Sequence, residues 1–287
     1  MDLVVATSRG RSLAHYFKYR WTAHLIWKKG ARISQLVEEA DKFLGKHKVN
    51  TRPHHVFFLA GLPDMTQRLK DKDDNYDEVT YTEPPEQTLD RISASITSAI
   101  YLISSQHHAR VSFATITPIS IKTWNEHRLN ISRTSRLKHQ QMYDTMQENL
   151  ISATVMINKY ILKINERNNI PTPRLAKKII KKVGKKRKTP RVYYGKLPDG
   201  VHPNESTAEE WIDIISMTML EARHPEFFLN GQYTPSLRSH PINPRPTPEP
   251  EVSPPMNSPS HHLPTLEQAS DASEEEEPLL RRQWRSY

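Results

Sequence analysis

Short apolar segments alternate with stretches of helical periodicity through residues 1–225, and this alternation constrains the fold more than any other feature. Five segments have the length and the β-branched or aromatic content of buried strands. These segments are residues 3–6, 24–27, 56–60, 111–115 and 192–194. Apolar stripes with spacings near 3.6 residues lie between or after them and predict helices. The stripes begin at Ile33, Leu89, Tyr143 and Trp211, and Ser206 with Glu209 has the spacing of a capping box for the last.

Alternating strands and helices predict a three-layer α/β/α sandwich of the flavodoxin-like type, with a parallel sheet of about five strands. We expect a single such domain at residues 1–225. Ligands bind sheets of this kind at the carboxyl ends of the strands. Polar side chains follow three of the predicted strands, so we expect them to converge on that edge. They are Ser8, then Asp64 in the segment that begins at Gly61, and then Asp199 with His202.

The composition changes after about residue 233. Eleven of the 22 prolines lie between Pro235 and Pro278, among serines and a run of glutamates. A segment of this kind buries too little apolar surface to order itself, so residues 233–287 are predicted to form a disordered tail. Extended proline-rich segments can also dock on partner proteins, which gives the tail an alternative role as an interaction segment.

Two absences narrow the expected location. The sequence contains no cysteine, so disulfides and thiolate metal sites are excluded, and a reducing interior is favoured. No run approaches the ~20 apolar residues of a membrane span, and the apolar start before Arg9 is shorter than a signal peptide requires. We therefore expect no transmembrane segment and an intracellular protein, cytoplasmic or nuclear.

The formal charge of +9 is concentrated in one segment. An insert at 174–191 has helical lysine spacing around Ile179, Ile180 and Val183, which predicts a short basic amphipathic helix that contacts RNA or DNA. The alternatives are a solvated loop and a nuclear-import signal. The candidate phosphate contacts are Lys177, Lys178, Lys181, Lys182, Lys185, Lys186, Arg187 and Lys188.

Asp199 and His202 carry the chemistry that stands out most. Hydrolysis by a serine needs a hydroxyl, a base that takes its proton, a carboxylate that orients the base and donors for the oxyanion. An aspartate three residues before a histidine, in a loop ahead of a capped helix, can supply the base and its carboxylate. The alternative interpretation is that Asp199 only caps a turn and that His202 is merely exposed.

The segment 197–204, Leu-Pro-Asp-Gly-Val-His-Pro-Asn, resembles the last sequence block of SGNH/GDSL-type serine hydrolases. Fainter matches to the earlier blocks lie at residues 6–8, at Gly30 and at residues 61–64, so the resemblance covers about residues 1–222. It implies a Ser8 nucleophile, a His202 base oriented by Asp199, and an oxyanion hole formed by the backbone amides of Gly30 and Ser8. It implies an acyl-ester substrate and no cofactor.

The sequence departs from the family pattern in two blocks. Ala6-Thr7 precedes the serine where the family has Gly-Asp, which removes no group that handles protons. Pro63 stands where the family has an asparagine that donates to the oxyanion, and proline offers neither a side-chain amide nor a backbone N–H. Loss of one such donor lowers turnover by ~10² to 10³. Ser12 is an alternative nucleophile, although it lies farther from the strand end.

The order of segments in the second half of the chain resembles that of SGNH-like domains in invertebrate retroelement-encoded proteins. It is a long helix, Asn165, a Pro-Thr-Pro-Arg-Leu segment at 171–175, the lysine-rich stretch and the final block. Two functions follow from the sequence. The first is weak or vestigial carboxylic-ester hydrolysis, and the second is an inactive SGNH-fold module that binds nucleic acid. The adjacent histidine pairs at 54–55, 107–108 and 261–262 lack the spacing of a metal site, so we expect no metal.

Overall fold

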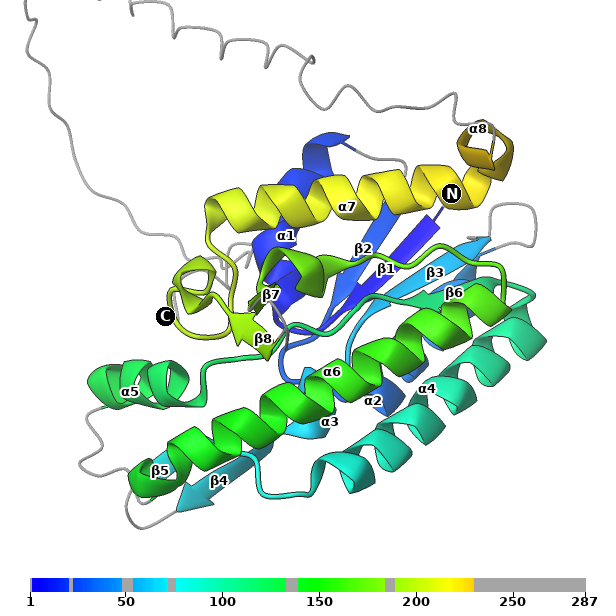
Figure 1. The fold of residues 1–287 in the computed structure, drawn as a ribbon. Coiled ribbons are helices and arrows are strands. Elements are labelled where there is room, and N and C mark those ends of the chain that lie inside the picture. Colours follow the sequence, from blue (N-terminus) through cyan, green and yellow to red (C-terminus); the bar gives the residue numbers. More distant parts are fainter. Residues whose placement is uncertain are drawn as a thin grey trace, which may run out of the picture. The chain divides into compact units, whose positions relative to one another are not determined.

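A computed structural model describes residues 2–20, 23–47, 54–71, 76–132, 139–183 and 189–229. At its centre is a parallel sheet of four strands in the order β2-β1-β3-β6 (Figure 1). The strands are β1 (Asp2–Ala6), β2 (Ala23–Trp27), β3 (His55–Leu59) and β6 (Arg110–Phe113). This order is the start of the doubly wound flavodoxin-like order, in which the chain reverses direction across the sheet at the first strand. The predicted fold class is confirmed.

Helices cover both faces of the sheet (Figure 1). On one face lie α1 (Arg9–Arg20) and α7 (Glu205–Arg223), and on the other lie α2 (Ile33–Lys46), α4 (Pro85–His107) and α6 (Tyr143–Arg167). Alternate residues of β1 belong to different apolar clusters, since Leu3 and Val5 pack with α2, α4 and α6 and Val4 packs with α1 and α7. Because both faces are covered, every residue of β1 is buried.

The remaining elements lie around this sandwich. A short helix, α3 (Leu62–Met65), follows β3, and an antiparallel hairpin of β4 (Gln67–Asp71) and β5 (Tyr76–Thr80) follows α3. Helix α5 (Ile121–Ser132) comes after β6, and α8 (Pro225–Leu229) ends the described part of the chain. Short 3₁₀ helices lie at Gln140–Met142, Leu175–Lys178 and Tyr194–Lys196.

Side chains from α6 bond the backbone at and just beyond β6. The Asn165 amide accepts from Phe113 N at 3.3 Å and donates to Phe113 O at 2.8 Å. About two turns earlier on α6, Asn158 pairs in the same way with the backbone of Ile116, at 2.6 and 2.8 Å. Both asparagines are buried. The side-chain amides therefore supply the hydrogen bonds that another strand would make with this edge.

The predicted fifth strand at 192–194 is not part of the central sheet. Instead β8 (Thr189–Val192) pairs antiparallel with β7 (Ile180–Val183) in a separate two-stranded ribbon. Pro190 lacks the N–H that a central strand must donate, which favours a ribbon edge over a position inside the sheet. Val192 packs partly against the apolar cluster under α1 and α7, so this end of the ribbon contacts the domain.

The predicted basic helix is also wrong. The chain forms a 3₁₀ helix at Leu175–Lys178 and then enters β7, because the β-branched Ile180 and Val183 pair with β8 in a register that a helix would break. Lys177, Lys178, Lys181 and Lys182 lie in these elements. Residues 185–188 and the predicted tail at 233–287 lie outside the described residues.

Helix α7 begins one residue before the predicted cap. Glu205 is its first residue, and the Asn204 side chain accepts a hydrogen bond from Thr207 N at 2.9 Å. Asn204 is therefore the N-cap in place of Ser206. The loop that contains Asp199 and His202 therefore ends at Asn204, directly before α7.

Candidate functional site

The turns that follow the sheet strands lie together at one edge of the sheet, because the strand ends are level. Ala6 pairs with Trp27 on one side and with Leu59 on the other. The turn after β1 is tied to the strand beside it, since Thr7 N donates to Leu59 O at 3.2 Å. Side chains in these turns therefore share the edge at which doubly wound sheets bind ligands.

Ser8 occupies the turn between β1 and α1 and is half-buried. It directly precedes the first helical residue, yet its hydroxyl makes no hydrogen bond with another described residue, so it does not act as a side-chain cap. Ser12, the alternative nucleophile, lies inside α1. The turn is tight: a Cβ on Gly10 would lie 2.6 Å from the Cβ of Ala6 and 2.7 Å from that of Trp27. Helix α1 therefore begins directly against the strands.

Asp199 and His202 are in direct contact. His202 Nδ1 lies 2.6 Å from Asp199 Oδ2, while Asp199 Oδ1 accepts from the backbone amides of Val201 at 2.8 Å and His202 at 2.6 Å. Asp199 thus caps the turn and also pairs with the imidazole. With Nδ1 bonded to a carboxylate, Nε2 is left as the nitrogen that can accept a proton.

Hydrogen bonds determine the charge of Asp199. Burial by itself raises the pKa of its carboxyl group, but the bonds from the side chain and backbone of His202 and from Val201 outweigh burial and lower the pKa to about 2. The side chain therefore stays ionised at neutral pH. An ionised carboxylate is the form that orients an imidazole base and stabilises the imidazolium that forms.

Gly200 lets the loop pack closely on the start of α5. Its φ is +81°, and a Cβ there would lie 2.8 Å from Ser120 O and 2.9 Å from Trp124 N. In return, Ser120 N donates to Gly200 O at 2.9 Å. The Trp124 ring lies beside the imidazole of His202, with ring centroids 5.9 Å apart. The segment after β6 and the first turn of α5 thus form one wall of the site.

The predicted oxyanion region lies in the turns after β2 and β3. Gly30 is exposed, with φ +64°, in the turn that leads into α2. Pro63 lies in the first turn of α3, and the next residue, Asp64, accepts from Ile33 N at 3.1 Å with both carboxylate oxygens. Asp64 therefore bonds the N-terminus of α2 and holds these two turns together. The family asparagine has no replacement at Pro63 itself.

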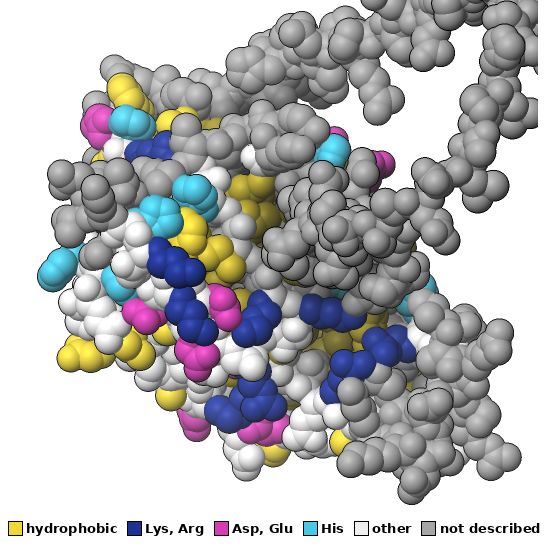
Figure 2. Space-filling model, turned by 180° about the vertical axis from the view of Figure 1, so that it is seen from behind, with side chains coloured by type: hydrophobic (Ala, Val, Ile, Leu, Met, Phe, Trp, Pro, Cys, Tyr) yellow, Lys and Arg dark blue, Asp and Glu magenta, His cyan; other side chains and the backbone are white. Residues whose placement is uncertain are grey.

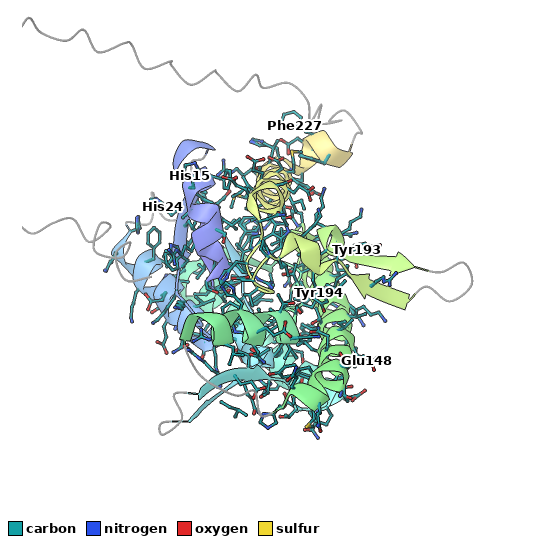
Figure 3. All side chains as sticks on the ribbon, turned by 90° about the vertical axis from the view of Figure 1, so that its left-hand side faces the viewer. His15, His24, Glu148, Tyr193, Tyr194 and Phe227 are labelled. Carbon is teal, nitrogen blue, oxygen red and sulfur yellow. The ribbon has the colours of Figure 1, made fainter. Side chains whose placement is uncertain are left out.

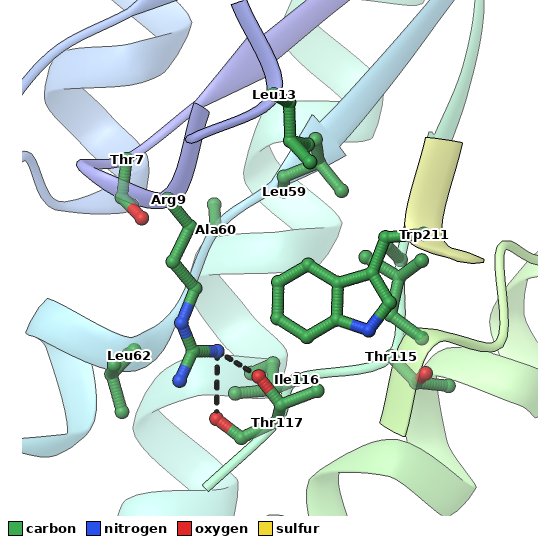
Figure 4. A pocket seen from close by; sticks show the side chains of 12 residues that line it. Thr7, Arg9, Leu13, Leu59, Ala60, Leu62, Thr115, Ile116, Thr117 and Trp211 are labelled. Carbon is green, nitrogen blue, oxygen red and sulfur yellow. Dashed lines mark hydrogen bonds between the residues drawn. The ribbon is translucent and has the colours of Figure 1, made fainter. Parts of the chain in front are cut away.

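Arg9 is a residue of this edge that the sequence analysis missed. It is 8% exposed, and its guanidinium bonds to backbone carbonyls of two loops: Nε to Val201 O at 3.0 Å, and Nη1 to Thr117 O at 2.8 Å. Figure 4 shows the side chain extending from the turn toward Thr117. Burial lowers the pKa of Arg9 to about 9, a shift that nearby Asp199 opposes, so it remains charged at neutral pH.

A small cavity lies behind the Ser8 turn, lined by Thr7, Arg9, Thr115 and Trp211 among others (Figure 4). Its volume of about 30 Å³ has room for one or two water molecules. The indole N–H of Trp211 is buried and has no partner among the described residues, which suits such a water. Neither Ser8 nor His202 lines this cavity, so it is separate from the predicted reaction site.

The structure thus joins some of the predicted site residues and leaves others apart. Asp199 and His202 pair directly, and Arg9, which follows Ser8, bonds to Val201, which precedes His202. No hydrogen bond links Ser8 with His202 within the described ranges. Catalytic hydrogen bonds are often long before substrate binds.

The described residues lack two features. They contain no group of three or more His, Asp or Glu side chains placed to hold a metal ion. None of their helices is both long enough and apolar enough to cross a membrane.

Comparison with known proteins finds similarity in structure. No protein-family model and no curated protein matches the sequence. A GDSL-like lipase from Bacteroides thetaiotaomicron is similar, with 16% identity, a TM-score of 0.46, and coverage of 78% of this chain and 88% of the lipase. A lipase/acylhydrolase from Enterococcus faecalis has 13% identity, a TM-score of 0.46, and coverage of 78% and 97%.

A psychrotrophic esterase from Pseudoalteromonas is similar at 13% identity and a TM-score of 0.40, with coverage of 80% of this chain and 98% of the esterase. In this chain the sheet has the strand order β2-β1-β3-β6. The Asp199–His202 loop lies beside the Ser8 turn, because Arg9 bonds to Val201. Both observations agree with a doubly wound parallel sheet whose site lies at the carboxyl ends of the strands.

Proposed function

We propose that this domain is a weak serine hydrolase of carboxylic esters, with Ser8 as the nucleophile, His202 as the general base and Asp199 as the carboxylate that orients it. The single observation that carries the proposal is the 2.6 Å pair of His202 Nδ1 and Asp199 Oδ2, in a loop that Arg9 joins to the Ser8 turn. An imidazole held in this way exposes Nε2 toward solvent and substrate.

The chemistry follows from these groups. Ser8 Oγ attacks the ester carbonyl carbon while His202 Nε2 takes its proton, and the imidazolium then protonates the departing alcohol. Water then attacks the acyl carbon while His202 Nε2 takes its proton. The imidazolium returns the proton to Ser8 Oγ as the bond between the acyl group and Ser8 breaks. The backbone amides of Ser8 and Gly30 are the proposed oxyanion donors. Because Pro63 offers no third donor, we expect low turnover.

The direct test measures hydrolysis of p-nitrophenyl acetate by the wild type and by Ser8→Ala, with Ser12→Ala as the matched control. We expect Ser8→Ala to fall to the uncatalysed rate and Ser12→Ala to keep the wild-type rate. A fluorophosphonate probe adds a readout that does not need turnover: Ser8 Oγ forms a bond to phosphorus and fluoride leaves. Equal rates and equal labelling in the wild type and Ser8→Ala would remove Ser8 from the mechanism.

A second candidate function is nucleic-acid binding by the basic segment, and the ribbon register favours it. The register pairs Lys181 with Arg191, so two basic positions of the sequence occupy opposite places in the ribbon. The hairpin projects from the domain beyond Tyr193 and Tyr194 (Figure 3). Figure 2 shows the molecule from behind. In the centre of that face, by contrast with the basic segment, Lys and Arg side chains lie beside Asp and Glu side chains.

Part of the local charge is already neutralised. Lys178 and Lys196 lie 3.7 and 3.0 Å from Glu210, whereas Lys177 is exposed. Binding of a labelled duplex should therefore weaken steeply with salt and be lost in a Lys177→Glu, Lys181→Glu and Arg191→Glu triple variant. The matched control is Lys28→Glu with Glu39→Lys, which reverses an ion pair elsewhere. Binding that ignores both salt and the triple change would exclude this function.

A further inference from the structure

We propose that Arg9 is a positioning residue of the hydrolase site, whose guanidinium holds the Asp199–His202 loop in register with the Ser8 turn. The inference rests on the proposed esterase function and adds to it a residue that does not itself touch substrate. Its basis is the set of hydrogen bonds that one buried side chain makes across three segments.

Arg9 is adjacent in sequence to the nucleophile and adjacent in space to the base. Its Nε donates to Val201 O at 3.0 Å, and Val201 is bonded in turn to the Asp199 carboxylate. Its Nη1 donates to both oxygens of Thr117, and Nη2 reaches Pro118 O at 3.4 Å. One planar group thus fixes the relative positions of the turn after β1, the segment after β6 and the loop before α7.

The absence of a fifth sheet strand makes this contact necessary. In a doubly wound sheet, a loop at the carboxyl edge is ordinarily held by the strand that leads into it. Here β8 leaves the central sheet, so no strand of that sheet within the described ranges leads into the Asp199–His202 loop. The loop is held instead by its contacts, and Arg9 and the Ser120–Gly200 bond are the ones that join it to the strand ends.

Only arginine has the geometry for this position. The guanidinium presents its donors in a fixed plane, so it can bond Val201 and Thr117 at once, whereas a lysine ammonium is a compact charge on a flexible stem. No carboxylate of the described residues lies within ion-pair distance of Arg9, and its bonds are to carbonyl and hydroxyl oxygens. Because the buried guanidinium bonds to backbone carbonyls, it fixes the backbone of the loops that carry them. A positioning residue has to do this.

The test compares Arg9→Met, Arg9→Lys and the wild type in two measurements. In hydrolysis of p-nitrophenyl acetate we expect kcat to fall about 100-fold in Arg9→Met and about 10-fold in Arg9→Lys, with KM changed less than about threefold, because misplacement by 1 Å can cost 10² in rate. In hydrogen exchange read by mass spectrometry, we expect the peptide containing Val201 and His202 to exchange faster in both variants.

Two controls separate positioning from general loss of structure. Arg11→Met makes the same change two residues farther along α1 on an exposed residue, and it should leave kcat unchanged. Ile215→Val lowers stability through the apolar cluster under α1 and α7, which does not contain Val201, and it should not speed exchange in the loop. If Arg9→Met does not fold, Arg9→Lys keeps the comparison, since it retains the charge and the stem.

Failure of this inference and failure of the proposed function give different results. A domain with no esterase activity, but with faster loop exchange in the Arg9 variants, would overturn the hydrolase proposal and keep the structural role of Arg9. An active domain in which Arg9→Met keeps the wild-type kcat and the wild-type exchange would overturn the role of Arg9 alone. A parallel rise of KM and fall of kcat in Arg9→Met and Ile215→Val would also overturn it.

Discussion

His202 Nδ1 and Asp199 Oδ2 lie 2.6 Å apart, and the other oxygen of the same carboxylate is bonded to two backbone amides of its own loop. The aspartate is therefore held on one side by the backbone and on the other by the imidazole. Any change at Asp199 alters the orientation of the ring and the shape of the loop together.

Asp199→Asn separates these two effects. The asparagine oxygen can still accept from the amides of Val201 and His202, but its NH₂ then faces Nδ1 and favours the tautomer with its proton on Nε2, which cannot act as the base. We expect kcat for p-nitrophenyl acetate to fall about 10² to 10⁴-fold with little loss of stability. A fall below tenfold, with the fold intact, would mean that Asp199 serves the turn and not the reaction.

Pro63→Asn should increase activity. The change restores a side-chain amide at the family's oxyanion position, and one such donor is worth ~10² to 10³ in turnover where the geometry is complete. We expect a gain of about 10-fold or more in kcat. Pro63→Ala is the matched control, because it also removes the ring and restores the backbone N–H but adds no side-chain amide. Equal rates for the asparagine and alanine variants would show that residue 63 does not face the oxyanion.

Gly200→Ala tests the packing of the loop against α5. Both Gly200 and Gly30 have positive φ, so alanine costs roughly 1 to 2 kcal/mol at either position from backbone strain. At Gly200 the added Cβ also meets Ser120 O at 2.8 Å, whereas at Gly30 nothing lies within 4 Å. Urea denaturation should therefore show a clearly larger loss for Gly200→Ala than for Gly30→Ala. Equal losses would contradict the close packing at Ser120.

His55 gives the domain a pH-dependent stability. Burial, and then the charges of Arg110 and Arg223, lower the pKa of this histidine from 6.5 to about 3. Between these values the unfolded chain binds a proton that the folded chain does not, so this contribution to stability is complete above pH 6.5 and is lost as the pH falls toward 3. The loss is at most about 1.4 kcal/mol per pH unit.

His55→Phe should flatten this dependence. The ring of His55 already stacks on Phe57, with centroids 4.1 Å apart, and its Nε2 has no hydrogen-bond partner among the described residues, so phenylalanine fits the site without losing a bond. Unfolding free energies measured from pH 4 to pH 7 should fall more steeply in the wild type than in the variant. Parallel curves would place the pH dependence on other groups.

The sequence was sufficient for the parts of the fold that local pattern determines. The four strands of the central sheet and the helices that begin near Ile33, Leu89 and Tyr143 follow from periodicity, because each buries an apolar face. The pairing of Asp199 with His202 follows from a three-residue spacing in one loop. The roles of Ser8 and Gly30 in the reaction stay predictions.

What the sequence did not reveal depends on long-range contacts. The bond from Arg9 to Val201 spans 192 residues, and no local pattern distinguishes Arg9 from an exposed arginine at the start of a helix. The lysines of 177–186 have helical spacing, yet in the described part of this segment residues 180–183 pair with β8 across the ribbon. Val192 looks like a core strand in composition, although Pro190 just before it argues against a central position.

The asparagines of α6 also govern how this sheet meets other molecules. A strand edge with free amides and carbonyls is a template on which a second chain can add its own strand, and natural proteins block such edges in several ways. At Phe113 and Ile116 the backbone groups are already bonded to Asn165 and Asn158. Between them, Thr115 N donates to Pro173 O at 3.0 Å. Two side chains and one passing backbone segment thereby protect this side of the sheet from edge-to-edge aggregation in place of a fifth strand.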